Sequence, residues 1–430
     1  MLLLRSCLWA TLLYVAKGTS SPWQGGLRQG SSAKDAADQQ RDLAGEVPTP
    51  PPFDEEDEEE CWDAEVNYAF FGAMTDSRNR VFECLGGIIQ PCEPIPIWQA
   101  DLESVGLEAA GVAQQLEWAA EYLTDVDPAK DLFMLWAGGN DYLGPYPGWT
   151  PGNDPPEYGE PFPPDFPPEF APVTAAYTTQ NMATALDRAY YDMDARIFLM
   201  GNFLNPCWTV VCTKFEAVDA FIPGFSTGLK LYADVWTDQF NRGMQTVVDD
   251  FLAIHTDATI MFMDFYSKFD ELLQSGDFIA NLTCKDAIAL GVADIDGPDM
   301  NGHYNCSDFA WTNDFHPTST FWGRIVDESL IPIIDETLEP ETDIRRIVVI
   351  GDSFTDKGTF QDTARRANET WAATWNGPPA NGEAAFDGYS LIDLMEQAMG
   401  LEPSVPFIQR STLDDAVPPP PKQACRPKYD

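Results

Sequence analysis

Short apolar runs alternate with amphipathic stretches along most of the chain, and this alternation constrains the fold more than any other feature. Five apolar runs stand out: EVNYAFFGA from Glu65, DLFMLWAGG from Asp131, RIFLMG from Arg196, TIMFMDFY from Thr259 and RRIVVIG from Arg345. Between them, apolar residues recur every three or four positions, which is typical of a helix with one buried face. Apolar strands that alternate with helices predict a parallel sheet between two helical layers. We therefore expect a three-layer α/β sandwich with a five-stranded parallel sheet.

The first 60 residues lack this alternation and divide into two segments. Residues 1–20 combine an early Arg5, a short apolar run and small residues, which is typical of a secretory signal peptide. Residues 21–60 lack hydrophobic periodicity and end in FDEEDEEE, so they are expected to form an acidic, solvated linker. Residues 61–430 are expected to form a single domain. Its proline-rich insertion at 144–172 follows a strand, and it either lines a substrate cleft or is a plain surface loop.

Charge and cysteine content narrow the possible partners and the compartment. The chain has 69 Asp and Glu against 25 Lys and Arg, a formal net charge of −44, and this field would repel nucleic acid. No run after the signal peptide reaches the length of a membrane span, so we expect a secreted, monomeric protein without an integral membrane segment.

Eight cysteines remain once the signal peptide is removed, an even number that suits an oxidising compartment. Their spacing suggests three local disulfides and leaves one long-range pair: Cys84–Cys92, Cys207–Cys212, Cys284–Cys306 and Cys61–Cys425. Two glycosylation sequons, at Asn281 and Asn368, are expected to carry glycans if the source glycosylates proteins. A third sequon, at Asn305, is weaker because its middle residue is a cysteine.

Histidines are scarce, and this limits where serine-based hydrolysis could occur. Of the three in the chain, His255 ends a long amphipathic stretch and His303 lies in a Gly/Asp/Asn loop. His316 belongs to the stretch NDFHP, in which Asp314 stands two residues before it and could orient the imidazole.

Two serines are candidates for the nucleophile. Ser226 lies in GFSTG, which matches the G-x-S-x-G elbow of α/β-hydrolases, but the stretch before it is a weak, proline-ended strand. A turn at the start of a helix is therefore the better interpretation of Ser226. Ser353 has the stronger context, because it follows a buried strand in IVVIGDSFTD.

Five blocks of the sequence together resemble the GDSL-type (SGNH) serine esterases and lipases. IVVIGDSFTD resembles the family's nucleophile block, WAGGNDY its G-x-N-D block and NDFHPT its histidine block. VNYAFFGAMTD resembles the block that contributes an oxyanion glycine, and NGPPANG with SLIDLMEQAMGL resembles the stretch after the nucleophile. The resemblance extends over residues 62–410. It implies the SGNH fold, an activity on carboxylic esters and no cofactor or metal.

The blocks occur in a different order from that of the family. The family order is Ser, Gly, Asn, Asp, His, whereas here the nucleophile block comes last. The same cyclic order opened at another position is a circular permutation, which folds tolerate when the old ends lie close together. A Cys61–Cys425 disulfide would then join the two new ends.

By this resemblance, each matching residue takes a role. Ser353 is the nucleophile, His316 the general base and then acid, and Asp314 orients His316. The N–H groups of Gly72 and Ser353 and the side chain of Asn140 form the oxyanion hole. Phe71 departs from the family pattern, which often has a glycine there.

Substrate identity is left open between lipid acyl esters and acetylated carbohydrate. Two alternatives to this function also stay open: an inactive secreted binding protein with the same fold, and an α/β-hydrolase that uses Ser226. The complete set of five site residues argues against the binding protein, which has no need of all five.

Overall fold

A computed structural model describes the part of the chain that forms the sheet and its helices. The described residues are 66–69, 73–76, 110–123, 125–143, 171–216, 219, 224–290, 293–294, 304–312, 316–340, 342–352, 354–356, 390–401 and 403–406. The expected signal peptide and acidic linker, and nearly all of the proline-rich insertion, lie outside these residues.

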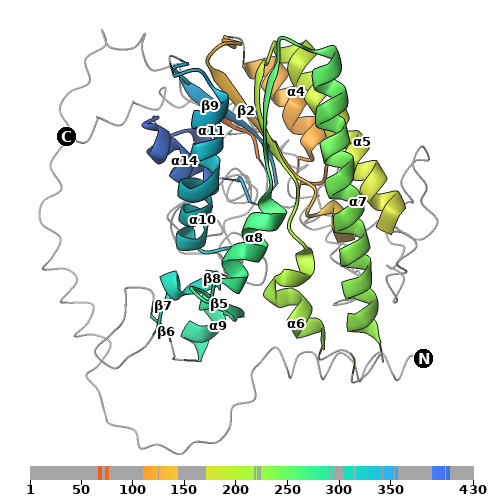
Figure 1. The fold of residues 1–430 in the computed structure, drawn as a ribbon, viewed down its shortest axis with the longest axis vertical. Coiled ribbons are helices and arrows are strands. Elements are labelled where there is room, and N and C mark those ends of the chain that lie inside the picture. Colours follow the sequence, from red (N-terminus) through yellow and green to blue (C-terminus); the bar gives the residue numbers. More distant parts are fainter. Residues whose placement is uncertain are drawn as a thin grey trace, which may run out of the picture. The chain divides into compact units, whose positions relative to one another are not determined.

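A parallel sheet forms the centre of the fold (Figure 1). Its spatial order is β10-β1-β9-β2-β3-β4, and every neighbouring pair is parallel. The strands are β1 (Val66–Asn67), β2 (Asp131–Trp136), β3 (Ile197–Gly201), β4 (Thr259–Met263), β9 (Arg346–Gly351) and β10 (Val405–Pro406). All residues of β2, β3 and β9 are buried, as expected for strands covered on both faces.

The number of strands differs from the expected five. Within the described residues the sheet has six strands, because β10 adds at the edge, where Val405 pairs with Val66 of β1. A two-residue strand that contains a proline has no periodicity to reveal it in the sequence, and it occupies the edge, where a missing N–H is tolerated.

One layer of helices covers the first face of the sheet. It consists of α4 (Val112–Tyr122), α5 (Ala171–Met193) and α7 (Phe225–Ile254), of which α4 contacts β9, α5 contacts β2 and α7 contacts β4. The start of α5 corrects the expected insertion boundary of 172, because the helix begins at Ala171. Pro172 is its second residue, where the absent N–H would have no partner in any case.

A second layer covers the other face (Figure 1). It comprises α8 (Phe265–Gln274), α10 (Ser319–Ile325), the π-helical turn η7 (Val326–Leu330), α11 (Ile331–Thr337) and α14 (Leu391–Met399). The run expected as a strand over TIMFMDFY ends at Met263, since the Asp264 side chain accepts from Ser267 N and caps α8. Ser390 and Asp393 form a capping box at the start of α14.

Short elements extend beyond the three layers. The helical turns η2 (Asp141–Leu143) and η4 (Pro206–Trp208) and the helix α6 (Val210–Glu216) follow the carboxyl ends of β2 and β3. Two small parallel sheets, β5 (Ile279–Thr283) with β8 (Phe309–Trp311) and β6 (Ala293–Asp294) with β7 (Tyr304–Asn305), lie between α8 and α10 together with α9 (Cys284–Ala289) and η6 (Cys306–Asp308). The sequence analysis did not anticipate these two sheets.

None of the helices in the described ranges is both long and apolar enough to cross a membrane.

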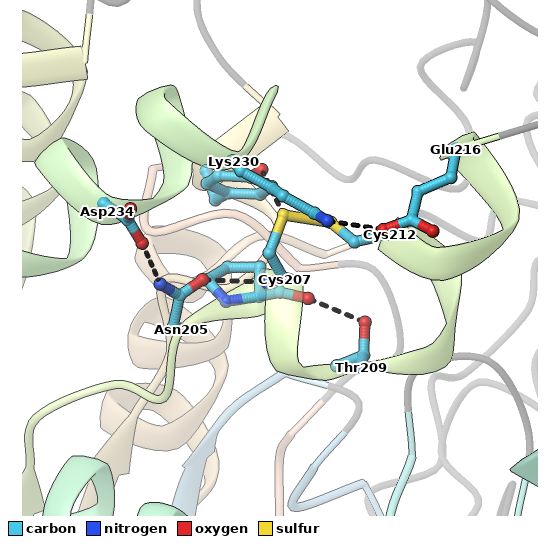
Figure 2. Close-up of a disulfide and its surroundings, with 9 residues drawn as sticks. Asn205, Cys207, Thr209, Cys212, Glu216, Lys230 and Asp234 are labelled. Atoms are coloured by element: carbon cyan, nitrogen blue, oxygen red, sulfur yellow. Dashed lines mark hydrogen bonds and ion pairs between the residues drawn. A yellow bond between two sulfur atoms is a disulfide. The ribbon is translucent and has the colours of Figure 1, made fainter. Parts of the chain in front are cut away.

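Two of the four expected disulfides fall within the described residues, and both are present. Cys284–Cys306 fastens α9 to η6, with 5.2 Å between the Cα atoms. Cys207–Cys212 joins η4 to α6, with 5.0 Å between the Cα atoms. Figure 2 shows the latter beside the Asn205–Asp234 and Lys230–Glu216 contacts that link this region to α7. Cys61–Cys425 and Cys84–Cys92 lie outside the described residues.

A buried ion-pair cluster fixes the amino ends of β2 and β9. Asp131 and Arg346 are register partners, and their side chains form an ion pair with 2.8 Å between Asp131 Oδ2 and Arg346 Nη2. Arg345 also binds the Asp131 carboxylate, with 2.7 Å from Nε to Oδ1. Burial alone would raise the pKa of Asp131, but the hydrogen bonds from the two arginines outweigh it and hold the pKa below its usual value.

Candidate active site

The neighbouring central strands β9 and β2 are followed by helices that pack on opposite faces of the sheet. The chain that leaves β2 enters α5 on one face, whereas the next described helix after β9 is α14 on the other. Open parallel sheets bind ligands at such a point, outside the carboxyl ends of the strands. Asn140 follows β2, and Asp352, which precedes the predicted Ser353 in the sequence, follows β9. Neighbouring strands therefore bring Asn140 and Asp352 to this end of the sheet.

The turn after β9 is closely packed. Gly351 pairs with Trp136, and its N–H and C=O both bond the side chain of Gln115, each at 2.9 Å. A Cβ at Gly351 would lie 2.7 Å from the Trp136 carbonyl oxygen and would also collide with the Thr355 hydroxyl. Glycine is therefore required where the strand passes into the turn.

Asp352 organises the backbone of the same turn. Its carbonyl oxygen accepts from the N–H groups of Thr355 and Asp356, each at 3.1 Å, and its Oδ1 accepts from Phe354 N at 3.1 Å. Burial raises the pKa of Asp352 to about 7, although the N–H groups of Phe354, Gly139 and Gly138 act in the opposite direction. Asp352 thus interacts with the loop after β2 as well as with its own turn.

The loop after β2 needs both of its glycines. Gly138 has a φ of +137°, and a Cβ there would meet the ring of Phe240 at 3.1 Å. A Cβ at Gly139 would lie 2.5 Å from the ring of Phe203. The backbone therefore lies close against the aromatic side chains, and Asn140 follows in a conformation that this packing sets.

Asn140 points at the segment that follows β1. Its Nδ2 donates to the Ala73 carbonyl oxygen at 3.0 Å, and Gly72 immediately precedes Ala73 in the sequence. The β1 segment is also tied to the turn after β9, because Asn67 Nδ2 donates to the Thr355 carbonyl oxygen at 2.7 Å. Three remote segments thus meet at the carboxyl ends of β1, β9 and β2.

His316 lies beside the turn after β9. Its ring centroid is 5.6 Å from that of Phe354, the residue that follows Ser353. The side chain is almost fully buried, and this burial lowers the pKa of His316 to about 4, which favours the neutral imidazole.

The backbone around His316 is held on both sides. The His316 carbonyl oxygen accepts a hydrogen bond from Thr312 N at 2.8 Å, and Pro317 forms an isolated antiparallel β-bridge with Trp311. Thr318 caps α10, and its hydroxyl donates to the Phe309 carbonyl oxygen at 2.7 Å. Neutral imidazole, unlike imidazolium, has one ring nitrogen that can act as an acceptor.

Three predicted residues, Gly72, Asp314 and Ser353, lie outside the described residues. Each stands next to or close to a described residue of the site in the sequence: Ala73, His316, and Asp352 with Phe354. Within the described ranges, no group of three or more His, Cys, Asp and Glu side chains could hold a metal ion.

The rival serine has a structural role in the first turn of α7. Ser226 is buried, its N–H donates to Asp219 Oδ1 at 2.8 Å, and its hydroxyl donates to Asp219 Oδ2. The Asp219 carboxylate thus caps the helix. This is the helix-start turn that the sequence indicated for Ser226.

Sequence reasoning missed two polar contacts of the site: the Gln115 side chain on Gly351, and the Asp141 carboxylate on Thr75. The signal for Asp141 was its place next to Asn140 in the WAGGNDY block. Gln115 had no such signal.

No model of a known protein family matches the chain, and no curated protein matches its sequence.

Proposed function

We propose that the chain is a secreted serine hydrolase of carboxylic esters with a circularly permuted SGNH fold. The observation that supports this most is the 5.6 Å between the ring centroids of His316 and Phe354. It brings the only histidine of the NDFHP block next to the residue after Ser353. A base beside the nucleophile turn is the first geometric requirement of a serine hydrolase.

The strand order supports the permutation. When β9 is counted as the first strand and numbering continues through β1, β2, β3 and β4, the spatial order of these five strands becomes 2-1-3-4-5. This is a common order of doubly wound sheets, and it has its ligand site between strands 1 and 3, here β9 and β2. The pairing of β10 with β1 is also consistent with new ends that lie close together.

In the proposed reaction, the Ser353 hydroxyl attacks the ester carbonyl carbon while His316 accepts its proton. The N–H groups of Gly72 and Ser353 and the Asn140 amide stabilise the oxyanion. The bond to the alcohol oxygen then breaks, and this oxygen takes the proton from His316. Water attacks the acyl-enzyme, again losing its proton to His316, and the acid leaves as Ser353 regains its proton.

Asp314 would orient His316, and the reaction uses no cofactor. The substrate is proposed to be a lipid acyl ester or an acetylated carbohydrate. A panel of p-nitrophenyl esters from acetate to palmitate, tested beside acetylated xylan, separates these two classes.

A fluorophosphonate probe tests the function directly. We expect covalent labelling of the wild-type protein, its loss in Ser353→Ala and its retention in the matched control Ser226→Ala. Labelling lost only in Ser226→Ala would assign the site to the α/β-hydrolase arrangement. A folded wild-type protein without labelling or ester hydrolysis would indicate the inactive binding protein instead.

A further inference from the structure

Asp141 and Thr75 form a buried contact that joins the loop after β2 to the segment after β1. Asp141 Oδ1 accepts from the Thr75 hydroxyl at 2.6 Å, and Asp141 Oδ2 accepts from Thr75 N at 3.0 Å. The two residues are only 1% and 2% exposed. Hydrogen bonds to a carboxylate are stronger than neutral ones, and two from one residue also fix its orientation.

The Thr75 hydroxyl is held by a third group. Asn181 of α5 donates from Nδ2 to Thr75 Oγ1 at 3.1 Å, so the hydroxyl donates to Asp141 while it accepts from Asn181. With both functions used, the hydroxyl has a single orientation. Thr75 is therefore a fixed point between β2 and α5.

The same two segments are joined a second time, by Asn140. Its Nδ2 donates one hydrogen to the Ala73 carbonyl oxygen at 3.0 Å. Because a planar amide carries two N–H bonds, this contact fixes the direction of the second. Each residue of this second contact lies close in sequence to a residue of the first: Asn140 directly precedes Asp141, and Ala73 is two residues before Thr75. The Thr75–Asp141 contact therefore sets the separation of the two segments across which Asn140 bonds Ala73.

We propose that Thr75 and Asp141 are positioning residues that orient the Asn140 amide toward the reacting carbonyl oxygen. The inference rests on the proposed function, in which Asn140 is an oxyanion donor. Such a donor lowers the barrier only if it is oriented before the reaction, and a misplacement of about 1 Å can cost about a hundredfold in rate.

The segment has other backbone contacts that would persist without the Thr75 hydroxyl. Val112 N donates to the Met74 carbonyl oxygen at 2.9 Å, and Ala113 N donates to the Asp76 carbonyl oxygen at 3.1 Å. These bonds tie the segment to the start of α4. Replacing Thr75 by the isosteric valine should therefore loosen Asn140 without unfolding the protein.

The test compares Thr75→Val with Thr75→Ser, which keeps the hydroxyl. We expect Thr75→Val to lower kcat by about tenfold to a hundredfold with KM nearly unchanged, and Thr75→Ser to restore most of the loss. In an Asn140→Ala background, Thr75→Val should have little further effect, because the group it positions is gone. An equal loss in both backgrounds, or wild-type kcat in a folded Thr75→Val protein, would overturn the proposal.

A second readout does not depend on activity. The side-chain amide signal of Asn140, assigned by its disappearance in Asn140→Ala, should be protected from hydrogen exchange in the wild type and in Thr75→Ser. It should lose protection in Thr75→Val. An inactive wild type with this pattern would refute the esterase function but support the positioning role of Thr75. Equal protection in all three proteins would refute that role, because the orientation of Asn140 would then not depend on the Thr75 hydroxyl.

Discussion

Under the proposed function, lowering the pH is expected to abolish ester hydrolysis only far below the range in which an ordinary histidine becomes protonated. Burial of His316 lowers its pKa from 6.5 to about 4. That difference corresponds to about 3 kcal/mol in favour of the neutral imidazole. At a pH of about 5.5, roughly 97% of His316 would be neutral, against roughly 9% for an unperturbed histidine, so the pool of competent enzyme would be about tenfold larger.

The assay is the pH dependence of kcat/KM, which reports the pKa of the base in the free enzyme. Phenyl acetate is suitable if the phenol is measured after quenching, because detection is then independent of pH. We expect the acid limb of the profile near pH 4. His255→Gln is a matched control, since His255 is also buried but caps α7, and this variant should leave the limb in place.

The same pKa can be measured without substrate. The chain has only three histidines, so isotope-labelled imidazole signals can be assigned with His316→Gln and followed by NMR. A His316 midpoint near 6.5 in folded protein would refute the reasoning, because it would mean that desolvation does not control the pKa of this imidazole. A midpoint near 4 combined with an acid limb near 6.5 would show that another group limits catalysis.

Three further predictions concern stability. Gly351→Ala should destabilise the fold severely, because the new Cβ would lie 2.7 Å from the Trp136 carbonyl oxygen; a urea midpoint equal to that of the wild type would contradict this. Asp131→Ala should lower the free energy of unfolding by about 3–5 kcal/mol by leaving Arg346 buried without its main partner, and a loss below about 1 kcal/mol would be inconsistent with a buried pair. The Asp352 pKa is raised, so the folded state binds its proton more tightly and this residue's contribution to stability falls as pH rises from about 4 to about 7. Asp352→Asn should match the wild type near pH 4 and become more stable than it by up to about 4 kcal/mol above pH 7, as measured by denaturation at several pH values.

Local sequence patterns were sufficient to locate the main strands of the central sheet. The five apolar runs correspond to β1, β2, β3, β4 and β9, and helices occupy the stretches between them. One helical stretch between β4 and β9 is irregular, because the π-helical turn η7 lies between α10 and α11. There, Ile331 N bonds the Val326 carbonyl oxygen. Pro332 follows and lacks an N–H, so a regular helix could not satisfy every carbonyl in this turn.

In the candidate site, too, the sequence indicated individual residues, whereas the structure was needed to show their contacts. Residue type and local context singled out His316, whereas Asn140 was indicated by the resemblance of the WAGGNDY block. Both are short, local features of the sequence. Three contacts of the site, in contrast, join residues that are between 38 and 288 positions apart in the sequence. They are the contacts of Asn140 with Ala73, of His316 with Phe354 and of Asn67 with Thr355.

The sequence by itself determined the α/β class, the positions of the main strands and the scarcity of histidine. Only the tertiary structure decided that β9 lies between β1 and β2, that β10 adds a sixth strand, and that Thr75 binds Asp141. The physical reason is that periodicity records which face of an element is apolar, and this is a local property. Which elements become neighbours depends on packing and hydrogen bonding among residues far apart in the chain, and no local pattern contains that information.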